Sequence, residues 1–217
     1  MSQKFTVLFD LDGTLVDTAP DLIRAHNHVM KKFGYPSKTI DELRNAVGSG
    51  AKAMMAKDNG KWKWFDEKIQ NEMTDEFISF YGKNILYEST LINGVKEFLE
   101  WCKNQDISMA VCTNKTEFLA IDLLKKIGIY DFFEYVSGYN TFEYCKPDPR
   151  HLLKTIDILN GDKCKSIMVG DSETDANAAK AAEIPMILLK YGYTEKKSEE
   201  IYHNHLIKDF TGIEKII

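Results

Sequence analysis

From residue 94 onward, short apolar runs alternate with amphipathic segments, and this alternation limits the fold more than any other feature of the chain. The runs that indicate buried strands are 107–112, 135–137, 166–169 and 186–189, with a further edge strand at 206–207. The segments with helical spacing of apolar residues are 95–102, 118–127, 152–159 and 176–183. Strands that alternate with helices form right-handed β-α-β units, so the sequence predicts a parallel sheet.

The N-terminal part of the chain adds one strand to this sheet and then becomes helical. Residues 5–9 form a continuous apolar run, which is typical of a strand buried on both faces of a parallel sheet. In the helical stretch, Thr18 is a predicted N-cap, and Thr39 and Glu42 have capping-box spacing. We predict an α/β fold: a Rossmann-like, doubly wound parallel sheet with an inserted all-helical cap. The predicted domains are a core of 1–16 and 86–217 and a cap of 17–85.

The composition of the 217 residues restricts the classes of partner. A net charge of −5 argues against a nucleic-acid-binding surface, although a pocket can still attract a small anion. No apolar run approaches the roughly 20 residues that span a bilayer, and the first strand begins too early to leave room for a signal peptide. The four cysteines form no C-x-x-C pair, so we expect reduced thiols in a cytoplasmic protein. We expect no nucleic-acid or membrane partner, and a monomer or weak homodimer.

Two carboxylates, Asp10 and Asp12, follow the first predicted strand and precede Gly13 and Thr14. Because alternate side chains of a strand point to opposite faces, these two acids start on the same side. Two anions at the end of a buried strand repel each other and are costly to desolvate. A bivalent cation is one solution, and carboxylate oxygens suit Mg²⁺. The motif therefore points to a Mg²⁺ site.

Polar residues also follow the other predicted strands, at the edge where open parallel sheets bind their ligands. These residues are Thr113, Asn114 and Lys115, then Lys146, and then Asp171 and Asp175. Acids, a hydroxyl and a lysine together suit phosphoryl transfer to a carboxylate. In that chemistry Asp10 would attack phosphorus, and Asp10 and Asp171 would hold Mg²⁺. Thr113 and Lys146 would bind the phosphoryl oxygens and offset their charge.

These motifs, in this order, resemble the haloacid dehalogenase superfamily of phosphohydrolases over nearly the whole chain. The family pattern is Asp-x-Asp-Gly-Thr, a Thr or Ser after the next core strand, a Lys, and Gly-Asp-x-x-x-Asp. The matching positions are Asp10–Thr14, Thr113, Lys146 and Gly170–Asp175, and the helical insertion lies where the family's C1 cap lies. The resemblance implies an aspartyl-phosphate on Asp10. It implies that Asp12 is the general acid for the leaving alcohol and later the base that activates water.

The resemblance also implies roles for neighbouring residues. The backbone carbonyl of Asp12 and the side chain of Asp171 would complete the protein ligands of Mg²⁺, and Asp175 would orient water or Lys146. Gly13 would allow the sharp turn after the strand. The residues expected around the substrate are Gly13, Thr14, Asn114, Gly48 and Gly50. The backbone N–H groups near Gly48 and Gly50 would meet the anion when the cap closes.

Within the superfamily, the chain most resembles the bacterial phosphoglycolate phosphatases, which implies a small phosphorylated metabolite, 2-phosphoglycolate, as substrate. The motifs that carry this likeness include Asp17–Asp21, Thr113–Lys115 and Tyr191–Tyr193. Two segments depart from that group. Tyr139 and Asn140 stand where small or acidic residues are usual, and Lys61–Trp64 has no counterpart. Both segments lie where substrate selection or cap closure would be affected.

Three alternatives stay open at this point. A β-phosphoglucomutase-like transferase has the same fold, but Thr14 after Asp-Gly favours a hydrolase. Sugar phosphates, nucleotides and pyrophosphate are other possible substrates. A phospho-receiver signalling domain also uses an aspartate acceptor, a Thr or Ser, a Lys and Mg²⁺. Receivers place the acceptor after the third strand, however, and have no inserted cap.

Overall fold

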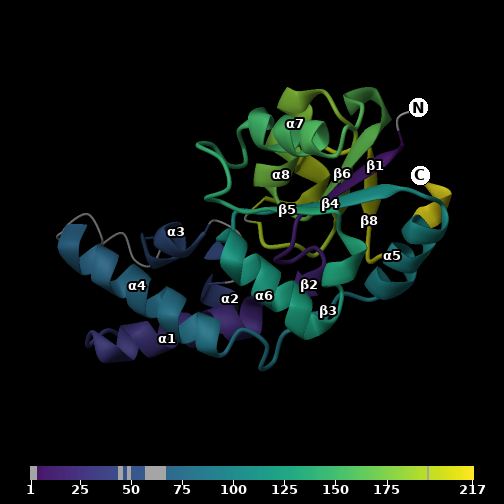
Figure 1. Ribbon diagram of the computed structural model, residues 1–217. Helices are drawn as coiled ribbons and strands as arrows, with labels where there is room; N and C mark the ends of the chain where they lie inside the picture. The colour runs from purple at the N-terminus through teal and green to yellow at the C-terminus, as the bar shows by residue number, and fades with distance from the viewer. Residues whose placement is uncertain (1–3, 44–45, 48–49, 57–66, 195) are drawn as a thin grey trace.

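The central element of the computed structural model is a six-stranded sheet (Figure 1), and the structure describes residues 4–43, 46–47, 50–56, 67–194 and 196–217. The strand order is β5-β4-β1-β6-β7-β8, and every neighbouring pair is parallel. The strands are β1 (Thr6–Phe9), β4 (Ser108–Cys112), β5 (Tyr135–Ser137), β6 (Ser166–Gly170), β7 (Met186–Leu189) and β8 (His205–Ile207). The predicted parallel sheet is confirmed, including its edge strand β8. The chain order reverses at β1, so the end of β1 lies at the topological switch point, where open sheets bind ligands.

The two faces of the sheet carry different hydrophobic clusters, because successive side chains of a strand alternate. Val7 and Phe9 of β1 pack in one cluster, Leu8 packs in the other, and all three are fully buried. The helices of the first face are α5 (Val95–Asn104) and α6 (Glu117–Ile127), and those of the second are α7 (Pro149–Ile158) and α8 (Glu173–Ala182). Helices therefore cover both faces, as a doubly wound sheet requires. Short 3-10 helices complete this part, namely η3 (Tyr130–Phe132), η4 (Lys163–Lys165), η5 (Ser198–Glu200) and η6 (Ile213–Lys215).

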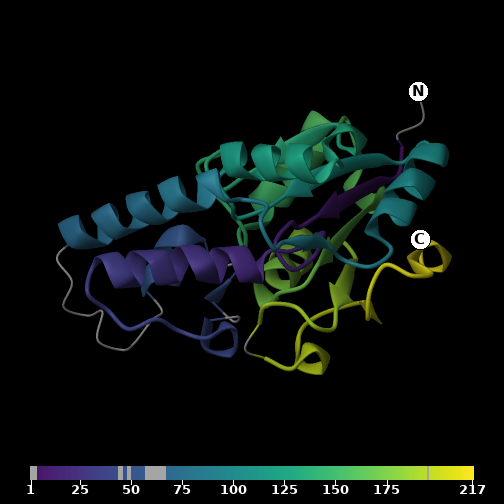
Figure 2. The same cartoon turned by 90° about the horizontal axis from the view of Figure 1, so that it is seen from below.

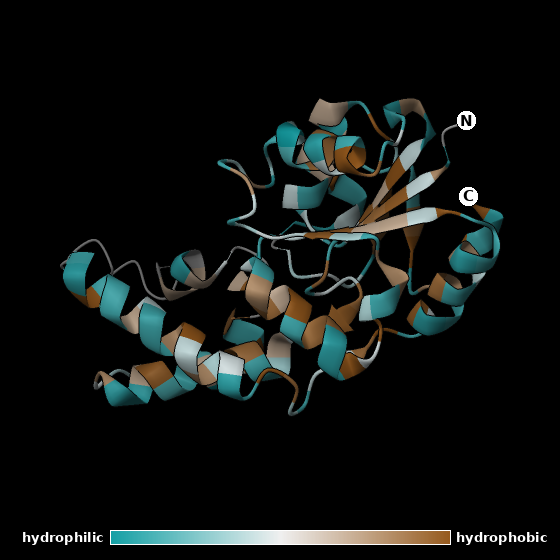
Figure 3. Ribbon diagram, viewed as in Figure 1, coloured by the Kyte–Doolittle hydropathy of each residue, from teal (hydrophilic) through white to brown (hydrophobic). Residues whose placement is uncertain are grey.

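A group of helices extends from one end of the sheet (Figures 1 and 2). Its members are α1 (Ala19–Lys32), α2 (Ile40–Leu43), α3 (Ala51–Ala56) and α4 (Glu67–Lys83). Helices α1 and α4 lie side by side, and the Glu76 carboxylate of α4 accepts hydrogen bonds from His28 at 2.8 Å and Lys32 at 2.6 Å. Hydrophilic and hydrophobic residues alternate along both helices, whereas the strands of the sheet are largely apolar (Figure 3). The predicted helical insertion is therefore present between the first two core strands.

The capping box of the insertion and the N-cap position at Thr18 are both confirmed. The Thr39 N–H donates to Glu42 Oε2 at 2.7 Å, and the Glu42 N–H donates to Thr39 Oγ1 at 3.3 Å. Thr18 does occupy the N-cap position of α1, but its hydroxyl donates to Asp12 Oδ1 at 2.7 Å. Thr18 has φ of −98° and ψ of −5°, whereas a residue whose side chain caps a helix normally has an extended backbone. The predictions made for Gly48 and for Lys61–Trp64 concern residues outside the described part of the chain.

Two very short strands join the helical group to the sheet, and the sequence analysis does not foresee them. Val16–Asp17 (β2) pairs antiparallel with Thr90–Leu91 (β3). Strands of two residues are too short to show an alternating pattern. None of the four cysteines, all of which are described, forms a disulfide. Among the described helices, none is long and apolar enough to cross a membrane.

Candidate active site

The predicted strand-end residues do come together beyond β1, β4, β5 and β6. The Lys146 ammonium, from the loop after β5, donates to Asp10 Oδ1 at 2.8 Å and to Asp175 Oδ1 at 2.6 Å. All three side chains are buried. Burial alone would disfavour the ammonium, but the charges of Asp10 and Asp175 raise the pKa of Lys146. The lysine therefore stays charged and provides a fixed positive group beside Asp10.

Asp10, Asp171 and Asp175 form an acidic cluster in which one ligand oxygen of each lies within 4.8 Å of the others. Burial, with Lys146 opposing it and Asp175 adding to it, raises the pKa of Asp10 to about 6. Burial also raises the pKa of Asp171 well above its usual value, and the charges of Asp175 and Asp10 raise it further. One lysine does not neutralise three buried carboxylates. A bound cation would supply the charge that this cluster lacks.

Asp175 is the most fully hydrogen-bonded member of the cluster. Its Oδ2 accepts from the Ser172 hydroxyl at 2.6 Å and from the Ser172 N–H at 3.1 Å, which closes a capping box at the start of α8. Its other oxygen accepts from Lys146. With both oxygens occupied, Asp175 holds Lys146 in place, which is the orienting role expected from the sequence.

Asp12 lies outside the acidic cluster and has its own lysine. Lys115 donates to Oδ1 and Oδ2 of Asp12 at 2.8 and 2.9 Å, and Thr18 donates to Oδ1. The side chains of Asp12 and Lys115 are only 8% and 5% exposed, so this is a buried ion pair. The repulsion between the two acids of the opening motif is thus relieved by two separate lysines, one for each acid.

Gly13 and Thr14 lie against Asp171 rather than against the space where a substrate would bind. The Thr14 hydroxyl donates to Asp171 Oδ1 at 3.2 Å, and the Tyr193 N–H donates to Oδ2 at 2.6 Å. Gly13 has φ of +84°, and a Cβ there would lie 2.3 Å from Asp171 Oδ2. The N–H groups of Gly13 and Thr14 are already bonded, to Val16 O and Leu11 O. In this arrangement neither residue has an N–H or O–H group left for the contact with a substrate that the sequence analysis predicts. Both residues instead hold the Asp171 carboxylate in position.

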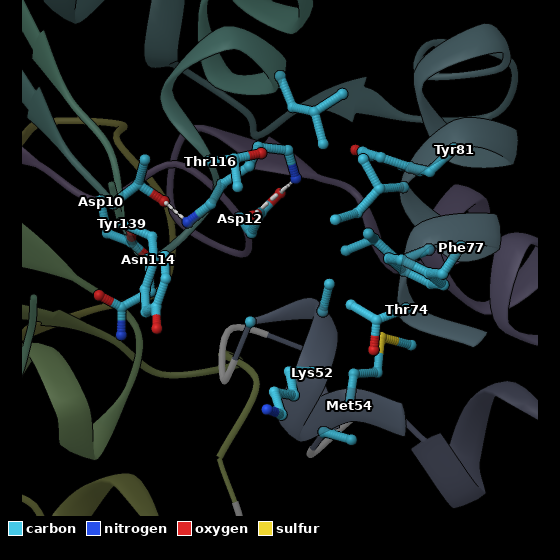
Figure 4. Close-up of a pocket in the computed structure, with 18 of the residues that line it drawn as sticks. Asp10, Asp12, Lys52, Met54, Thr74, Phe77, Tyr81, Asn114, Thr116 and Tyr139 are labelled. Carbon is cyan, nitrogen blue, oxygen red and sulfur yellow. Dashed lines mark hydrogen bonds and ion pairs between the residues drawn. The ribbon is translucent and has the colours of Figure 1, made fainter. Parts of the chain in front are cut away.

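A cavity of about 580 Å³ separates the strand ends from the helical group (Figure 4). Asp10, Asp12 and Thr113 line it on the side of the sheet. Phe77 and Tyr81 of α4 line it from the opposite side. The cavity therefore opens directly onto the two acids of the opening motif.

Asn114 and Gly50 also line this cavity, as the sequence analysis expects of substrate-contacting residues. The Asn114 amide donates to Lys146 O at 2.9 Å, while its Oδ1 is buried and has no partner among the described residues. Gly50 has φ of +86°, and a Cβ there would lie 3.6 Å from Asn114 O. The start of α3 therefore approaches the strand end of β4. Tyr139, from the divergent loop, lines the cavity as well and is 55% exposed.

Known proteins resemble this chain along most of its length. The family model for haloacid dehalogenase-like hydrolases matches residues 7–189. The chain belongs to the haloacid dehalogenase-like hydrolases. It is 39% identical to a phosphoglycolate phosphatase of Agrobacterium fabrum, over 95% of this chain and 89% of that protein. It is 36% identical to one of Caulobacter vibrioides, over 97% of this chain and 89% of that protein. The crystal structure of a predicted phosphoglycolate phosphatase from Haemophilus somnus matches with a TM-score of 0.92 and 29% identity, over 100% of this chain and 99% of that one.

In this haloacid dehalogenase-like hydrolase, sequence reasoning missed two residues at the site, Tyr81 and Tyr193, and it missed the pairing of a third, Lys115, with Asp12. Lys115 pairs with Asp12, Tyr81 faces it from the helical group, and Tyr193 reaches Asp171. The Lys115 ammonium lies 4.6 Å from the centre of the Tyr81 ring. Lys115 and Tyr193 belong to the motifs Thr113–Lys115 and Tyr191–Tyr193, which the sequence analysis quotes. Those motifs were therefore the signal from which both residues could have been predicted to lie at the site. Tyr81 reads only as one apolar position of an amphipathic helix, and no local pattern distinguishes it.

Proposed function

We propose that this hydrolase is a Mg²⁺-dependent phosphatase that cleaves a small phosphomonoester through an aspartyl-phosphate on Asp10, with 2-phosphoglycolate as the substrate. One observation carries the proposal: Asp10, held by Lys146, and Asp12, held by Lys115, line the same cavity. The two acids lie in different surroundings, which suits one nucleophile and one group that transfers protons. The names of the similar phosphatases support the choice of substrate.

The acidic cluster fits Mg²⁺. Asp10 and Asp171 are buried carboxylates with raised pKa values and neighbouring oxygens, and hard oxygen ligands of this kind suit the ion. Asp10, Asp171 and the backbone carbonyl of Asp12 would hold it. When bound, Mg²⁺ offsets the negative charge of the phosphoryl group and of the attacking carboxylate. Asp175 already has both oxygens bonded by other groups, so it would position Lys146 instead.

In the first step, an Asp10 oxygen attacks phosphorus and the bond from phosphorus to the ester oxygen breaks. Asp12 must enter this step protonated, and it gives that proton to the ester oxygen, so the leaving group departs as an alcohol and Asp12 is left as the carboxylate that pairs with Lys115. Lys146 and Thr113 bind the phosphoryl oxygens, whose charge they offset. Thr113 is fixed for this role, because its N–H donates to Ser137 O at 2.9 Å and its Oγ1 accepts from the Lys115 N–H at 3.2 Å.

In the second step, water displaces Asp10 from phosphorus. Asp12 takes a proton from that water, and the oxygen of the water attacks the aspartyl-phosphate. The bond from phosphorus to the Asp10 oxygen breaks, which releases inorganic phosphate and restores the carboxylate. Thr18 and Lys115 keep the Asp12 side chain in one orientation through both steps.

The helical group, about 17–85, would act as the cap over this chemistry. Its contacts with the core lie around the cavity, where Gly50 approaches Asn114 and Tyr81 faces Lys115. Closure would exclude water from the first step and select the leaving group. A cytoplasmic location and a monomeric or weakly dimeric state remain predictions of the sequence.

The decisive variant is Asp10→Asn, which replaces the nucleophile with an amide of the same shape. We expect kcat for 2-phosphoglycolate to fall at least about a thousandfold, since a nucleophile has no substitute. Asp157→Asn makes the same change on the exposed side of α7 and is the matched control. Release of phosphate is measured with Mg²⁺ and with EDTA, on 2-phosphoglycolate, sugar phosphates, nucleotides and pyrophosphate.

The same assay separates the enzyme from a signalling domain. Steady release of phosphate at many turnovers per protein agrees with the proposal. A stable phosphoprotein with no turnover would favour the receiver alternative. Normal turnover by Asp10→Asn would refute the assigned nucleophile, and indifference to Mg²⁺ would refute the metal assignment.

A further inference from the structure

Three polar groups line the cavity beside Asp12, and no step described above uses them for binding. The Tyr81 hydroxyl of α4 is buried, on a side chain that is 1% exposed, and has no hydrogen-bond partner among the described residues. The Thr116 Oγ1 is likewise buried and unpartnered within the described part of the chain. Lys115 also lines the cavity, and its ammonium lies 4.6 Å from the centre of the Tyr81 ring. In Figure 4 the Tyr81 hydroxyl points from α4 toward Thr116 and Asp12.

Two unpaired hydroxyls in one wall are unusual, because a buried polar group without a partner destabilises a fold. Thr116 is the N-cap residue of α6, where threonine normally bonds a backbone N–H of the first turn, yet its side chain makes no such bond. Burial and the nearby charge of Asp12 raise the pKa of Tyr81, so its phenol keeps its proton and can donate. Both hydroxyls are thus left available to a ligand in the cavity.

We infer that Tyr81, Lys115 and Thr116 form a subsite for a carboxylate on the leaving group of the phosphomonoester. All three side chains offer N–H or O–H donors, and a carboxylate has two oxygens with about four acceptor positions. The Lys115 ammonium has three protons, and its bonds to Asp12 use two of them. The N-terminus of α6, where Thr116 lies, adds partial positive charge. The inference deepens the proposed function and rests on it.

The position of the subsite fixes the length of the leaving group. Asp12 must lie within hydrogen-bond distance of the ester oxygen to protonate it. Lys115 lies 2.8 Å from Asp12, on the side of Tyr81. A carboxylate joined to the ester oxygen through one carbon therefore reaches Lys115 and its two neighbours. Phosphomonoesters of 2-hydroxy acids have this geometry, and 2-phosphoglycolate is the smallest of them.

Other donors also line the cavity, namely Lys52, Gln70, Thr74, Asn114 and Tyr139, so the subsite is assigned by its position beside Asp12. Phe77, Ile78 and Leu119 form an apolar part of the wall that offers no donor. A leaving group with an aliphatic end would fit that wall, but it would leave the hydroxyls of Tyr81 and Thr116 unpaired. The enzyme should therefore distinguish a carboxylate from a methyl group at the same position by a large factor.

The test compares 2-phosphoglycolate with ethyl phosphate, in which a methyl group replaces the carboxylate. For the full-length protein with Mg²⁺, we expect kcat/KM to be at least a hundredfold higher for 2-phosphoglycolate, because three donors lose their acceptor in ethyl phosphate. In Tyr81→Phe and in Thr116→Val this ratio should fall about tenfold, as expected for one hydrogen bond to a charged group. The loss should appear mainly in KM, since the carboxylate is bound before and during the reaction.

Two measurements separate binding from structure. Tyr81→Phe removes an unpaired buried hydroxyl, so without substrate its melting temperature should equal or exceed that of the wild type. Tyr202→Phe, near β8 and outside the cavity, is the matched control and should leave the substrate ratio unchanged. Lys115→Met is less informative, because it also removes the partner of Asp12.

The outcomes are distinct. Equal activity on both substrates in the wild type would leave a phosphatase but overturn the subsite. Equal losses on both substrates in Tyr81→Phe and Thr116→Val, or no loss in either variant, would overturn it too. Failure of the wild type to hydrolyse any phosphomonoester with Mg²⁺ would overturn both the function and the subsite.

Discussion

At the scale of single residues, the site depends on how closely the chain packs around Asp171. A Cβ at Gly13 would lie 2.3 Å from Asp171 Oδ2, and one at Gly192 would lie 2.1 Å from Asp171 O. Thr14 and Tyr193 bond the two carboxylate oxygens. Glycine is needed at these two positions because any side chain would collide with Asp171, and at Gly13 also because φ is positive. The space that the two glycines leave beside Asp171 is therefore part of the site.

Gly13→Ala should lower activity more than it lowers stability. The added methyl group must displace Asp171, and with it a proposed Mg²⁺ ligand, so the Mg²⁺ concentration for half-maximal activity should rise at least tenfold. The positive φ adds about 1–2 kcal/mol of strain. The measurements are a Mg²⁺ titration of phosphate release and a urea unfolding curve.

Gly128→Ala is the control for that strain. Gly128 has φ of +80°, and a Cβ there would have no atom within 4 Å. It should lose similar stability and keep the wild-type Mg²⁺ requirement. A similar Mg²⁺ requirement in both variants and the wild type would contradict the role given to Gly13.

At the scale of elements, two side chains fasten the connections between the helical group and the sheet. Tyr193 bonds Asp17 through its hydroxyl, which also accepts from the Ala19 N–H at 3.0 Å, so it holds the first connection. Asp21 in the first turn of α1 holds the second, because its carboxylate accepts from the N–H groups of residues 87–89 and from the Ser89 hydroxyl. Burial alone would raise the pKa of Asp21, but the bonds from Ser89, Tyr87 and Glu88 outweigh it and lower that pKa.

Asp21→Asn should destabilise the protein by about 2–3 kcal/mol at pH 7, because an amide turns N–H groups toward donors that need an acceptor. A lowered pKa means that the carboxylate stabilises the fold above its unfolded-state pKa of about 3.9 and loses this effect as the pH falls further. The difference from the wild type should therefore stay constant from pH 7 to about 5 and shrink below about pH 4. Urea unfolding at several pH values measures it.

Asp41→Asn makes the same change at an exposed position in the first turn of α2 and should change stability little. A difference between Asp21→Asn and the wild type that grows on acidification would contradict this account.

At the scale of the whole molecule, the acidic cluster should make stability depend on pH and, through the proposed Mg²⁺, on metal. Asp10 has a folded-state pKa of about 6, mainly because it is buried. A carboxyl group whose pKa is raised by folding favours the folded state at low pH, and this contribution is lost as the pH rises from about 4 to about 6. An ion that binds only the folded state reverses the loss.

Without metal, the wild type should therefore lose stability relative to Asp10→Asn as the pH rises from 5 to 7, because the variant lacks one of the buried carboxylates. Millimolar Mg²⁺ should raise the melting temperature of the wild type more at pH 7 than at pH 5. Asp157→Asn should behave like the wild type. Thermal melts of the three proteins in EDTA and in Mg²⁺ are the measurement, and a difference between the wild type and Asp10→Asn that does not change from pH 5 to pH 7 would refute the prediction.

The sequence could predict the sheet and the strand ends because both depend on local patterns. The run at 5–9 and the alternation after residue 94 show in a single window, and Asp10, Lys146 and Asp171 each stand just after such a run or its loop. It could not predict the partners of those residues. Lys115 and Asp12 lie 103 positions apart, and Tyr193 and Asp17 lie 176 apart, so only the fold brings them together.

Sequence separation does not explain the bond of Thr18, because its partner Asp12 lies only six positions away. Thr18 is the N-cap residue that its local signature predicts, but its hydroxyl bonds Asp12 and not the backbone of α1. Thr14 stays a predicted substrate contact, and its bond to Asp171, 157 positions away, is one that no local pattern could indicate. β2 and β3 consist of two residues each, so pairing across the whole insertion, rather than any pattern within it, defines them.

That pairing has a further consequence. Val16 lies opposite Leu91 and Asp17 opposite Thr90, so the chain leaves the sheet and returns to it at neighbouring points. The length of the segment between them makes little difference to closing this gap, because closure entropy grows only slowly with length. A different helical segment, grafted between Asp17 and Thr90, would therefore meet the same sheet and the same strand ends. The fold thus separates the sheet and its strand ends from a helical segment that could be exchanged without altering them.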